Sequence, residues 1–239
     1  MRKIKKVLID QEGNRYYWSE GNLSTHSGVI DENNIKKAKS KVLSHLSKEF
    51  IIFDASFTDK IERMKRGPAI ITKKDIGLII TTAGINKKSR IVDAGTGTGM
   101  LASFLANISP NVTTYERHPD FFNLAKKNFE SLDIKIKIKN KDIYNGIDEK
   151  NLDLVTLDLP EPWRVLSFAK KSLKIGAFLV CYLPTITQVI ELVNQAKNSF
   201  LVEKVSELLE REWYVENLRV RPKSQMIAHT AFLVFLRNL

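Results

Sequence analysis

The sequence predicts an α/β protein in which helices cover a mostly parallel sheet, preceded by a smaller region rich in β-strands. Two observations carry this prediction. From Thr72 onward, strand-like and helix-like segments alternate along the chain, a pattern typical of parallel sheets with helices on both faces. A glycine-rich turn from Asp93 to Gly99 also joins a predicted strand to a predicted helix, and such a unit brings backbone N–H groups up to a ligand.

The first 66 residues are predicted to form a small β-rich domain of their own. Two apolar runs, residues 7–9 and 15–18, flank turn-forming residues, which predicts a hairpin. Residues 50–53 form another predicted strand. The 239-residue chain is therefore expected to divide into domains at residues 1–66 and 67–239.

Two helices are predicted within this first region. Apolar residues at helical spacings predict a helix over residues 34–46. A second helix is predicted over residues 58–65, with Thr58 as its N-cap. Gly67 and Pro68 then mark the boundary with the next domain.

The larger region contains the alternating elements. Predicted helices span residues 74–83, 100–108, 119–131, 163–173 and 187–196, and predicted strands span residues 90–93, 112–115, 134–139, 152–158, 177–183, 202–215 and 231–236. Gly84 is expected to end the first of these helices. Strict alternation of isoleucine and lysine over residues 134–139 predicts an edge strand, whose lysines discourage pairing with another chain. An antiparallel strand is expected to close the sheet.

The glycine spacing distinguishes two kinds of nucleoside cofactor. Gly95, Gly97 and Gly99 form G-x-G-x-G, whereas dinucleotide sites prefer G-x-G-x-x-G. Glu116 follows the next predicted strand, about 20 residues after the first glycine, where a carboxylate can accept hydrogen bonds from ribose hydroxyls. The G-x-G-x-G form is the one associated with S-adenosylmethionine, which is the predicted cofactor.

Four residues are predicted to converge on one site. Gly95, Glu116, Asp142 and Asp158 each lie at or just past the end of a predicted strand. Ligands of open α/β sheets bind beyond the carboxyl ends of the strands, where the strand order reverses. There Asp142 could meet the amino group of an adenine, or it could simply be a loop carboxylate that starts a turn.

The segment from Asp158 to Trp163 is the predicted place of chemistry. Pro160 and Pro162 stiffen it, and it resembles the Asp/Asn-Pro-Pro-aromatic signature of enzymes that methylate amino groups of bases. A carboxylate at residue 158 could bind the amino group of a base and leave a ring nitrogen facing the methyl donor. If that nitrogen is N1 of adenine, the ring gains positive charge in the transition state, which a fixed anion stabilises.

The charge of the chain favours nucleic acid as a partner. The formal net charge is +11, and excess lysine and arginine attract phosphate backbones; the lysine-rich surface of a thermophile is the alternative. No metal site is predicted, because the four histidines share no ligand spacing. No apolar run approaches the roughly 20 residues that cross a bilayer, so no membrane contact and a cytoplasmic location are expected.

The motifs together resemble one family. The matching residues are 25–31, 66–75, 93–99, 115–117, 157–163, 184–189, 221–222, 226, 229–230 and 232–233. In these the chain resembles the tRNA (adenine-N1)-methyltransferases that modify position 58 in the T-loop, and position 57 as well in some archaeal members. The resemblance implies a class I (Rossmann-like) methyltransferase domain, a small N-terminal β domain that argues against the helix over residues 34–46, tRNA as substrate, and a homotetramer.

The resemblance also assigns roles to residues. Asp158 is the predicted catalytic residue, which would contact the target adenine. The predicted S-adenosylmethionine-binding residues are Asp93, Gly95, Thr96, Gly97, Thr98, Gly99, Met100, Leu101, Glu116, Arg117 and Asp142.

This chain departs from the family pattern at two places. Thr72 and Lys73 replace the Tyr-Pro that often precedes Lys-Asp, and Ala228 replaces a glycine. Two other functions are weighed against tRNA methylation: a protein methyltransferase of the isoaspartyl-repair type, and a non-catalytic tRNA-binding subunit. A non-catalytic subunit would be expected to have a damaged glycine loop or to lack Asp158, and both features are intact here.

Overall fold

The computed structural model describes residues 3–67 and 70–239. Its contacts divide the chain into two compact units, one comprising Met1–Lys65 with Lys127–Ile134 and the other Arg66–Lys126 with Lys135–Leu239. The domain boundary expected after residue 66 stays a prediction, and Pro68 of the expected boundary pair lies outside the described residues. Among the residues described, no helix combines the length and the apolar character needed to cross a membrane.

The first unit is built on a four-stranded antiparallel sheet in the order β2-β1-β6-β5. These strands are β1 (Lys6–Ile9), β2 (Arg15–Trp18), β5 (Lys41–Leu43) and β6 (Glu49–Asp54), and a separate hairpin pairs β3 (Leu23–Thr25) with β4 (Gly28–Ile30). The predicted hairpin of β1 and β2 is confirmed. Leu8, Trp18, Phe50 and Ile52 bury one face of the sheet.

The predicted helix over residues 34–46 is wrong. Helix α1 (Glu32–Lys37) is only six residues long and begins at Asp31, whose side chain accepts a hydrogen bond from the N–H of Asn33 at 2.8 Å. The chain then pairs as β5, which buries Val42 but leaves Leu43 54% exposed. The apolar spacing therefore reflects a short helix followed by a strand, as the β-rich resemblance implied.

The expected N-cap of the second helix is also wrong. Helix α2 (Phe57–Glu62) is capped by Ser56 rather than Thr58. The N–H of Asp59 donates to the Ser56 hydroxyl at 3.2 Å, and the Asp59 carboxylate accepts from the N–H of Ser56 at 2.9 Å. This reciprocal capping box begins the helix one residue earlier than predicted.

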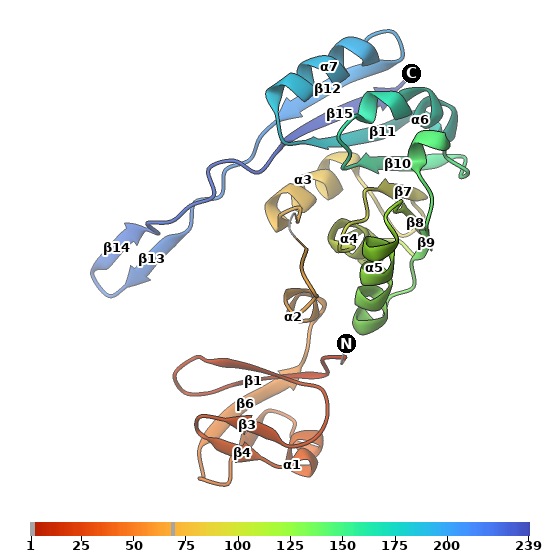
Figure 1. The fold of residues 1–239 in the computed structure, drawn as a ribbon. Helices are drawn as coiled ribbons and strands as arrows, with labels where there is room; N and C mark the ends of the chain where they lie inside the picture. The colour runs from red at the N-terminus through yellow and green to blue at the C-terminus, as the bar shows by residue number, and fades with distance from the viewer. Residues whose placement is uncertain (1–2, 68–69) are drawn as a thin grey trace. The chain divides into compact units, whose positions relative to one another are not determined.

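The second unit contains a seven-stranded sheet in the order β12-β15-β11-β10-β7-β8-β9 (Figure 1). Its strands are β7 (Ile91–Ala94), β8 (Val112–Tyr115), β9 (Lys137–Lys139), β10 (Leu152–Leu157), β11 (Leu173–Leu183), β12 (Phe200–Ser206) and β15 (Phe232–Asn238). The five neighbouring strands β9, β8, β7, β10 and β11 pair in parallel. Strand β15 pairs antiparallel with both β11 and β12. The predicted mostly parallel sheet with a closing antiparallel strand is confirmed.

Helices cover both faces of this sheet. The helices are α3 (Lys73–Ala83), α4 (Met100–Ile108), α5 (Pro119–Leu132), α6 (Leu166–Ser172) and α7 (Ile186–Ala196). Residues of α3 and α4 share one apolar core with the sheet, and residues of α6 and α7 share another. Successive residues of β10 alternate between these cores, with Leu154 in the first and Leu157 in the second.

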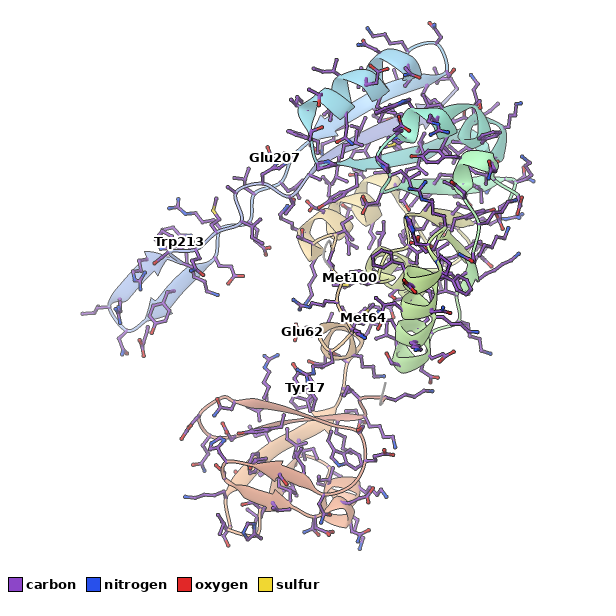
Figure 2. All side chains as sticks on the ribbon, in the orientation of Figure 1. Tyr17, Glu62, Met64, Met100, Glu207 and Trp213 are labelled. Atoms are coloured by element: carbon purple, nitrogen blue, oxygen red, sulfur yellow. The ribbon has the colours of Figure 1, made fainter. Side chains whose placement is uncertain are left out.

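Several predicted elements of this unit need correction. Only residues 137–139 of the predicted edge strand pair with β8, and the helix expected over residues 163–173 is a 3₁₀ turn, η2 (Pro162–Val165), followed by α6. The single strand expected over residues 202–215 is two strands. The chain leaves the sheet near Glu207 and forms a separate hairpin of β13 (Trp213–Glu216) and β14 (Arg219–Pro222), the arm (Figure 2).

Candidate active site

The strand order reverses between β7 and β10. The chain passes from β7 to β8 and β9 on one side and then returns to place β10 on the other side of β7. Past the carboxyl ends of these strands lies a cavity of about 330 Å³, the expected position for a ligand in such a sheet. Gly95, Glu116, Asp142 and Asp158 all line it, so the predicted convergence of these four residues is confirmed.

Gly95 brings the glycine loop against the segment that follows β10. Its φ is +84°, and a Cβ atom at this residue would lie 2.1 Å from the carbonyl oxygen of Asp158. The N–H of Asp158 in turn donates to the carbonyl of Ala94 at 2.9 Å. Only glycine satisfies both the left-handed backbone and the close approach, and the loop and Asp158 are thereby held together.

Glu116 fixes the other side of the glycine loop. Its Oε2 accepts a hydrogen bond from the N–H of Gly97, and its Oε1 accepts one from the N–H of His118, both at 2.9 Å. The residue is only 6% exposed. Each carboxylate oxygen keeps a second lone pair, so Glu116 can order the loop and also accept hydrogen bonds from ribose hydroxyls.

Asp93 lies beneath the cavity rather than in its lining. Its carboxylate is buried and accepts hydrogen bonds from the hydroxyls of Thr114 and Thr156, both at 2.7 Å, on the two flanking strands. Burial raises the pKa of Asp93. In this structure the residue ties β7, β8 and β10 together under the site.

The other residues predicted to bind cofactor divide into two groups. Gly97, Thr98 and Arg117 line the cavity, whereas Thr96, Gly99, Met100 and Leu101 do not. Gly99 adopts a φ of +86° as the N-cap of α4, and Leu101 packs into the core. This second group therefore shapes the turn and the helix, and the prediction that its members contact cofactor stays a prediction.

Asp142 fits both of the interpretations weighed for it. Its Oδ1 accepts a hydrogen bond from the N–H of Tyr144 at 3.0 Å and so begins a 3₁₀ turn, η1 (Ile143–Asn145). Its Oδ2 lies 3.6 Å from the Arg117 guanidinium, at the edge of the cavity.

The sequence reasoning missed most of the apolar and aromatic lining. The further lining residues are Tyr115, His118, Phe121, Lys141, Ile143, Tyr144, Leu159 and Pro160. Tyr144 is held in place by the Arg164 guanidinium, 4.3 Å from its ring centre, and by the N–H of Glu161, which donates to its hydroxyl at 3.2 Å. The sequence did contain one sign of this lining: the aromatic Tyr144 stands two residues after Asp142, a carboxylate predicted to lie past a strand end.

Asp158 has unusual electrostatics. The residue is exposed at the cavity opening, but protein atoms surround the carboxyl closely enough to reduce its hydration. This desolvation raises the pKa of Asp158 to about 7, with a further contribution from the negative charge of Asp93. A positively charged ligand beside Asp158 would lower this pKa again and relieve the repulsion.

The cavity suits S-adenosylmethionine. Its carboxylates would offset the charge of a sulfonium, although Arg117 and Lys141 also line it. Glu116 would offer oxygens to a ribose, and Phe121, Ile143 and Tyr144 would offer apolar surface to a base. A second cavity of about 530 Å³ has Thr72 and Lys74, at the start of α3, on one side and residues of the arm and its flanking segments on the other. It is lined mainly by charged and polar residues. It contains no residue from the strand ends, so we place the cofactor in the first cavity.

Comparison with known proteins identifies the family. The tRNA methyltransferase complex GCD14 subunit family matches residues 63–231. The chain belongs to this family. It is 33% identical to the tRNA (adenine(57)-N(1)/adenine(58)-N(1))-methyltransferase TrmI of Methanocaldococcus jannaschii, over 97% of this chain and 94% of the relative. It is 34% identical to the tRNA (adenine(58)-N(1))-methyltransferase TrmI of a Thermus thermophilus strain, over 97% of this chain and 96% of the relative.

Solved structures agree with this membership in the GCD14 family. The tRNA (m1A58) methyltransferase TrmI of Aquifex aeolicus has a TM-score of 0.83 at 28% identity, covering 100% of this chain and 98% of that one. A SAM-dependent O-methyltransferase of Thermotoga maritima has a TM-score of 0.87 at 28% identity, covering 100% and 94%. The predicted family and the predicted methyltransferase fold are therefore confirmed.

Proposed function

We propose that this protein transfers a methyl group from S-adenosylmethionine to N1 of an adenine in the tRNA T-loop, at position 58 and, as in the archaeal relative, position 57. The observation that carries the proposal is the placement of Asp158 across from the glycine loop, in one cavity with Glu116. The cofactor and the acceptor can then meet at the switch point of the sheet.

The residues of this chain act by binding and alignment. S-adenosylmethionine supplies an activated methyl group when bound. Glu116 accepts hydrogen bonds from the ribose hydroxyls, and Asp158 accepts one from the amino group of the adenine, so that N1 faces the donor. Because the adenine ring gains positive charge as the methyl group arrives, the Asp158 carboxylate stabilises the transition state more than the ground state. The target base must first leave its stack in the tRNA.

The experiment that tests this function is nucleoside mapping. Unmodified tRNA is incubated with the protein and labelled S-adenosylmethionine, and the product is digested and sequenced. We expect 1-methyladenosine at position 58, and the map reports position 57 in the same run. A parallel reaction contains a peptide in place of tRNA. Label in the peptide but not in the tRNA would instead support protein methylation, and no labelled product in either reaction would support a non-catalytic subunit.

The role of Asp158 has a matched control. Asp158→Asn should lower the rate of methyl transfer by about 100-fold or more, the usual loss when one charge-stabilising group is removed. The loss of cofactor affinity should be much smaller. Asp153→Asn makes the same change at the opposite end of β10, where Asp153 bonds Lys174 and the N–H of Arg90. It should keep the wild-type rate. Equal rates for both variants would exclude the assigned role.

We also propose that the protein forms a homotetramer and that the arm lies in one of its interfaces. No residue in the arm's two strands is buried in the single chain, and Trp213 and Val215 are 54% and 69% exposed. An isolated two-stranded hairpin is marginally stable in water, which supports a second copy of the chain as the partner that covers it.

Light scattering tests the assembly. Four chains of 27.3 kDa each are expected in the wild-type particle. Trp213→Glu should dissociate it, whereas Ile175→Glu, at a residue that is 87% exposed and outside the arm, should not. A wild-type monomer would exclude the tetramer. The tRNA substrate also leads us to propose a cytoplasmic location, which cell fractionation would test. We further propose that the chain divides into domains at residues 1–66 and 67–239, and limited proteolysis should then cut it near residue 67.

A further inference from the structure

Asp75 is a fully buried carboxylate outside the cofactor cavity. It lies in the first turn of α3, and Lys74 donates to its Oδ1 at 2.8 Å. Its Oδ2 accepts from the hydroxyls of Thr72 at 2.8 Å, Thr230 at 2.9 Å and Tyr182 at 3.3 Å. A buried charge is costly unless it is paired and hydrogen-bonded, and Thr230 and Tyr182 come from segments more than 100 residues away.

One of these donors is a neighbour of the proposed acceptor site. Strands β10 and β11 pair in parallel with Leu157 opposite Cys181. Asp158 follows the end of β10 directly, and Tyr182 is the next residue of β11. Leu157 and Cys181 both pack into the core that contains α6 and α7. Tyr182, the next residue of β11, therefore points to the opposite face of the sheet, where it packs beside α3.

The hydroxyl of Tyr182 is kept as a donor. Burial, together with the nearby carboxylates of Asp75 and Asp158, raises the pKa of Tyr182 to about 12. The phenol keeps its proton, which it donates to Asp75. This bond fixes the rotation of the Tyr182 side chain.

Another of these donors reaches Asp75 from the base of the arm. Thr230 precedes β15, where the chain returns from the arm to the sheet. Besides donating to Asp75, its hydroxyl accepts a hydrogen bond from Lys74 at 2.8 Å. One carboxylate oxygen of Asp75 thus bonds both Thr230 and Tyr182, and the three segments meet on a single atom.

We propose that Asp75 is a positioning residue for methyl transfer, which holds Tyr182 against the place where the acceptor base meets Asp158. This inference rests on the proposed function. A free Tyr182 would leave the base with room to shift, and a misplacement of about 1 Å can cost about 100-fold in rate. Asp75 itself touches neither substrate, and it acts through Tyr182.

A double-mutant cycle tests this role in the full-length protein. Asp75→Asn, Tyr182→Phe and the double variant are compared in single-turnover methyl transfer to unmodified tRNA, at saturating cofactor. We expect each single variant to lose about tenfold in rate, a smaller loss than full misplacement of the base. The double variant should be no slower than the slower single variant, with unchanged affinity for S-adenosylmethionine. Losses that multiply would instead show that the two residues act independently of each other.

A second cycle keeps the inference falsifiable if Asp75→Asn does not fold. Thr230→Val removes one donor to Asp75 and leaves the carboxylate and its ion pair with Lys74 in place. Combined with Tyr182→Phe, it should also show non-multiplying losses. Multiplying losses, or wild-type rates in the single variants, would overturn the inference. A wild-type protein that forms no 1-methyladenosine would overturn the proposed function instead.

Discussion

Gly95→Ala should disable methyl transfer by displacing Asp158. The substitution has two costs. A left-handed backbone costs an alanine roughly 1–2 kcal/mol. In addition, the new Cβ would lie 2.1 Å from the carbonyl oxygen of Asp158, where contacts below 3.0 Å are essentially never seen. One of the two segments must therefore move by about 1 Å, and a shift of that size at a reacting group can lower the rate about 100-fold.

Gly84→Ala is the matched control for this variant. Gly84 also has a left-handed backbone, with a φ of +62°, but a Cβ there would meet nothing within 4 Å. It ends α3, away from the cavity. Gly95→Ala should lose more stability in thermal unfolding than Gly84→Ala, because it adds the clash with Asp158 to the backbone cost that both share. Only Gly95→Ala should lose single-turnover methyl transfer to tRNA.

The two variants also define what would refute the reasoning. The rates are measured well below the unfolding temperature of each variant, so that every sample is folded. If Gly95→Ala transfers methyl groups within about threefold of the wild-type rate, the close approach to Asp158 does not position the reacting groups. If Gly84→Ala slows as much as Gly95→Ala, backbone strain alone explains the loss.

Three further predictions concern the charges of the site. Because the pKa of Asp158 is raised to about 7 and the carboxylate is the active form, kcat/KM for the cofactor should rise with pH and level off above about pH 7; an increase that persists in Asp158→Asn would refute this assignment. The same raised pKa means that the folded state favours the protonated acid, so Asp158→Asn should unfold at a higher temperature than wild type at about pH 8 and lose that advantage as pH falls toward about 4. Glu116→Gln should weaken S-adenosylmethionine binding by about tenfold or more, since hydrogen bonds to charged groups contribute roughly 1.5–3 kcal/mol; calorimetry showing unchanged affinity would exclude contact with the ribose.

The parts of the fold that local patterns specify were predicted well. The glycine turn, the strand-end carboxylates and the stop of α3 at Gly84 depend on residues within a few positions of one another. The capping box at Ser56 was missed in favour of Thr58, although its local signal, Asp59 three residues after Ser56, is present in the sequence. The helix expected over residues 34–46 failed because β5 is specified by pairing with β6, a contact that periodicity does not describe.

The parts that were missed depend on residues distant in sequence. Tyr144 and Phe121 line the cavity because a 3₁₀ turn and a helix begin at different strand ends. Asp75 gives a stronger case, since its donors Tyr182 and Thr230 lie 107 and 155 residues away. An aspartate in the first turn of a helix usually needs no partner beyond that turn, so the sequence contains no sign of these bonds.

The distribution of charge separates the two binding tasks of the protein. The chain carries a formal net charge of +11, yet Glu116, Asp142 and Asp158 bring negative charge into the cofactor cavity. The cationic surface attracts the phosphate backbone of tRNA without regard to sequence, whereas the acidic cavity favours a sulfonium donor and an adenine that becomes positive on methylation. After transfer, the donor has lost its charge and the base has gained one. The cavity therefore retains a favourable charge interaction throughout the reaction, first with the donor and then with the product base. Higher salt should accordingly weaken tRNA binding much more than cofactor binding, because charges on the open surface are screened strongly and charges enclosed in a cavity are screened less.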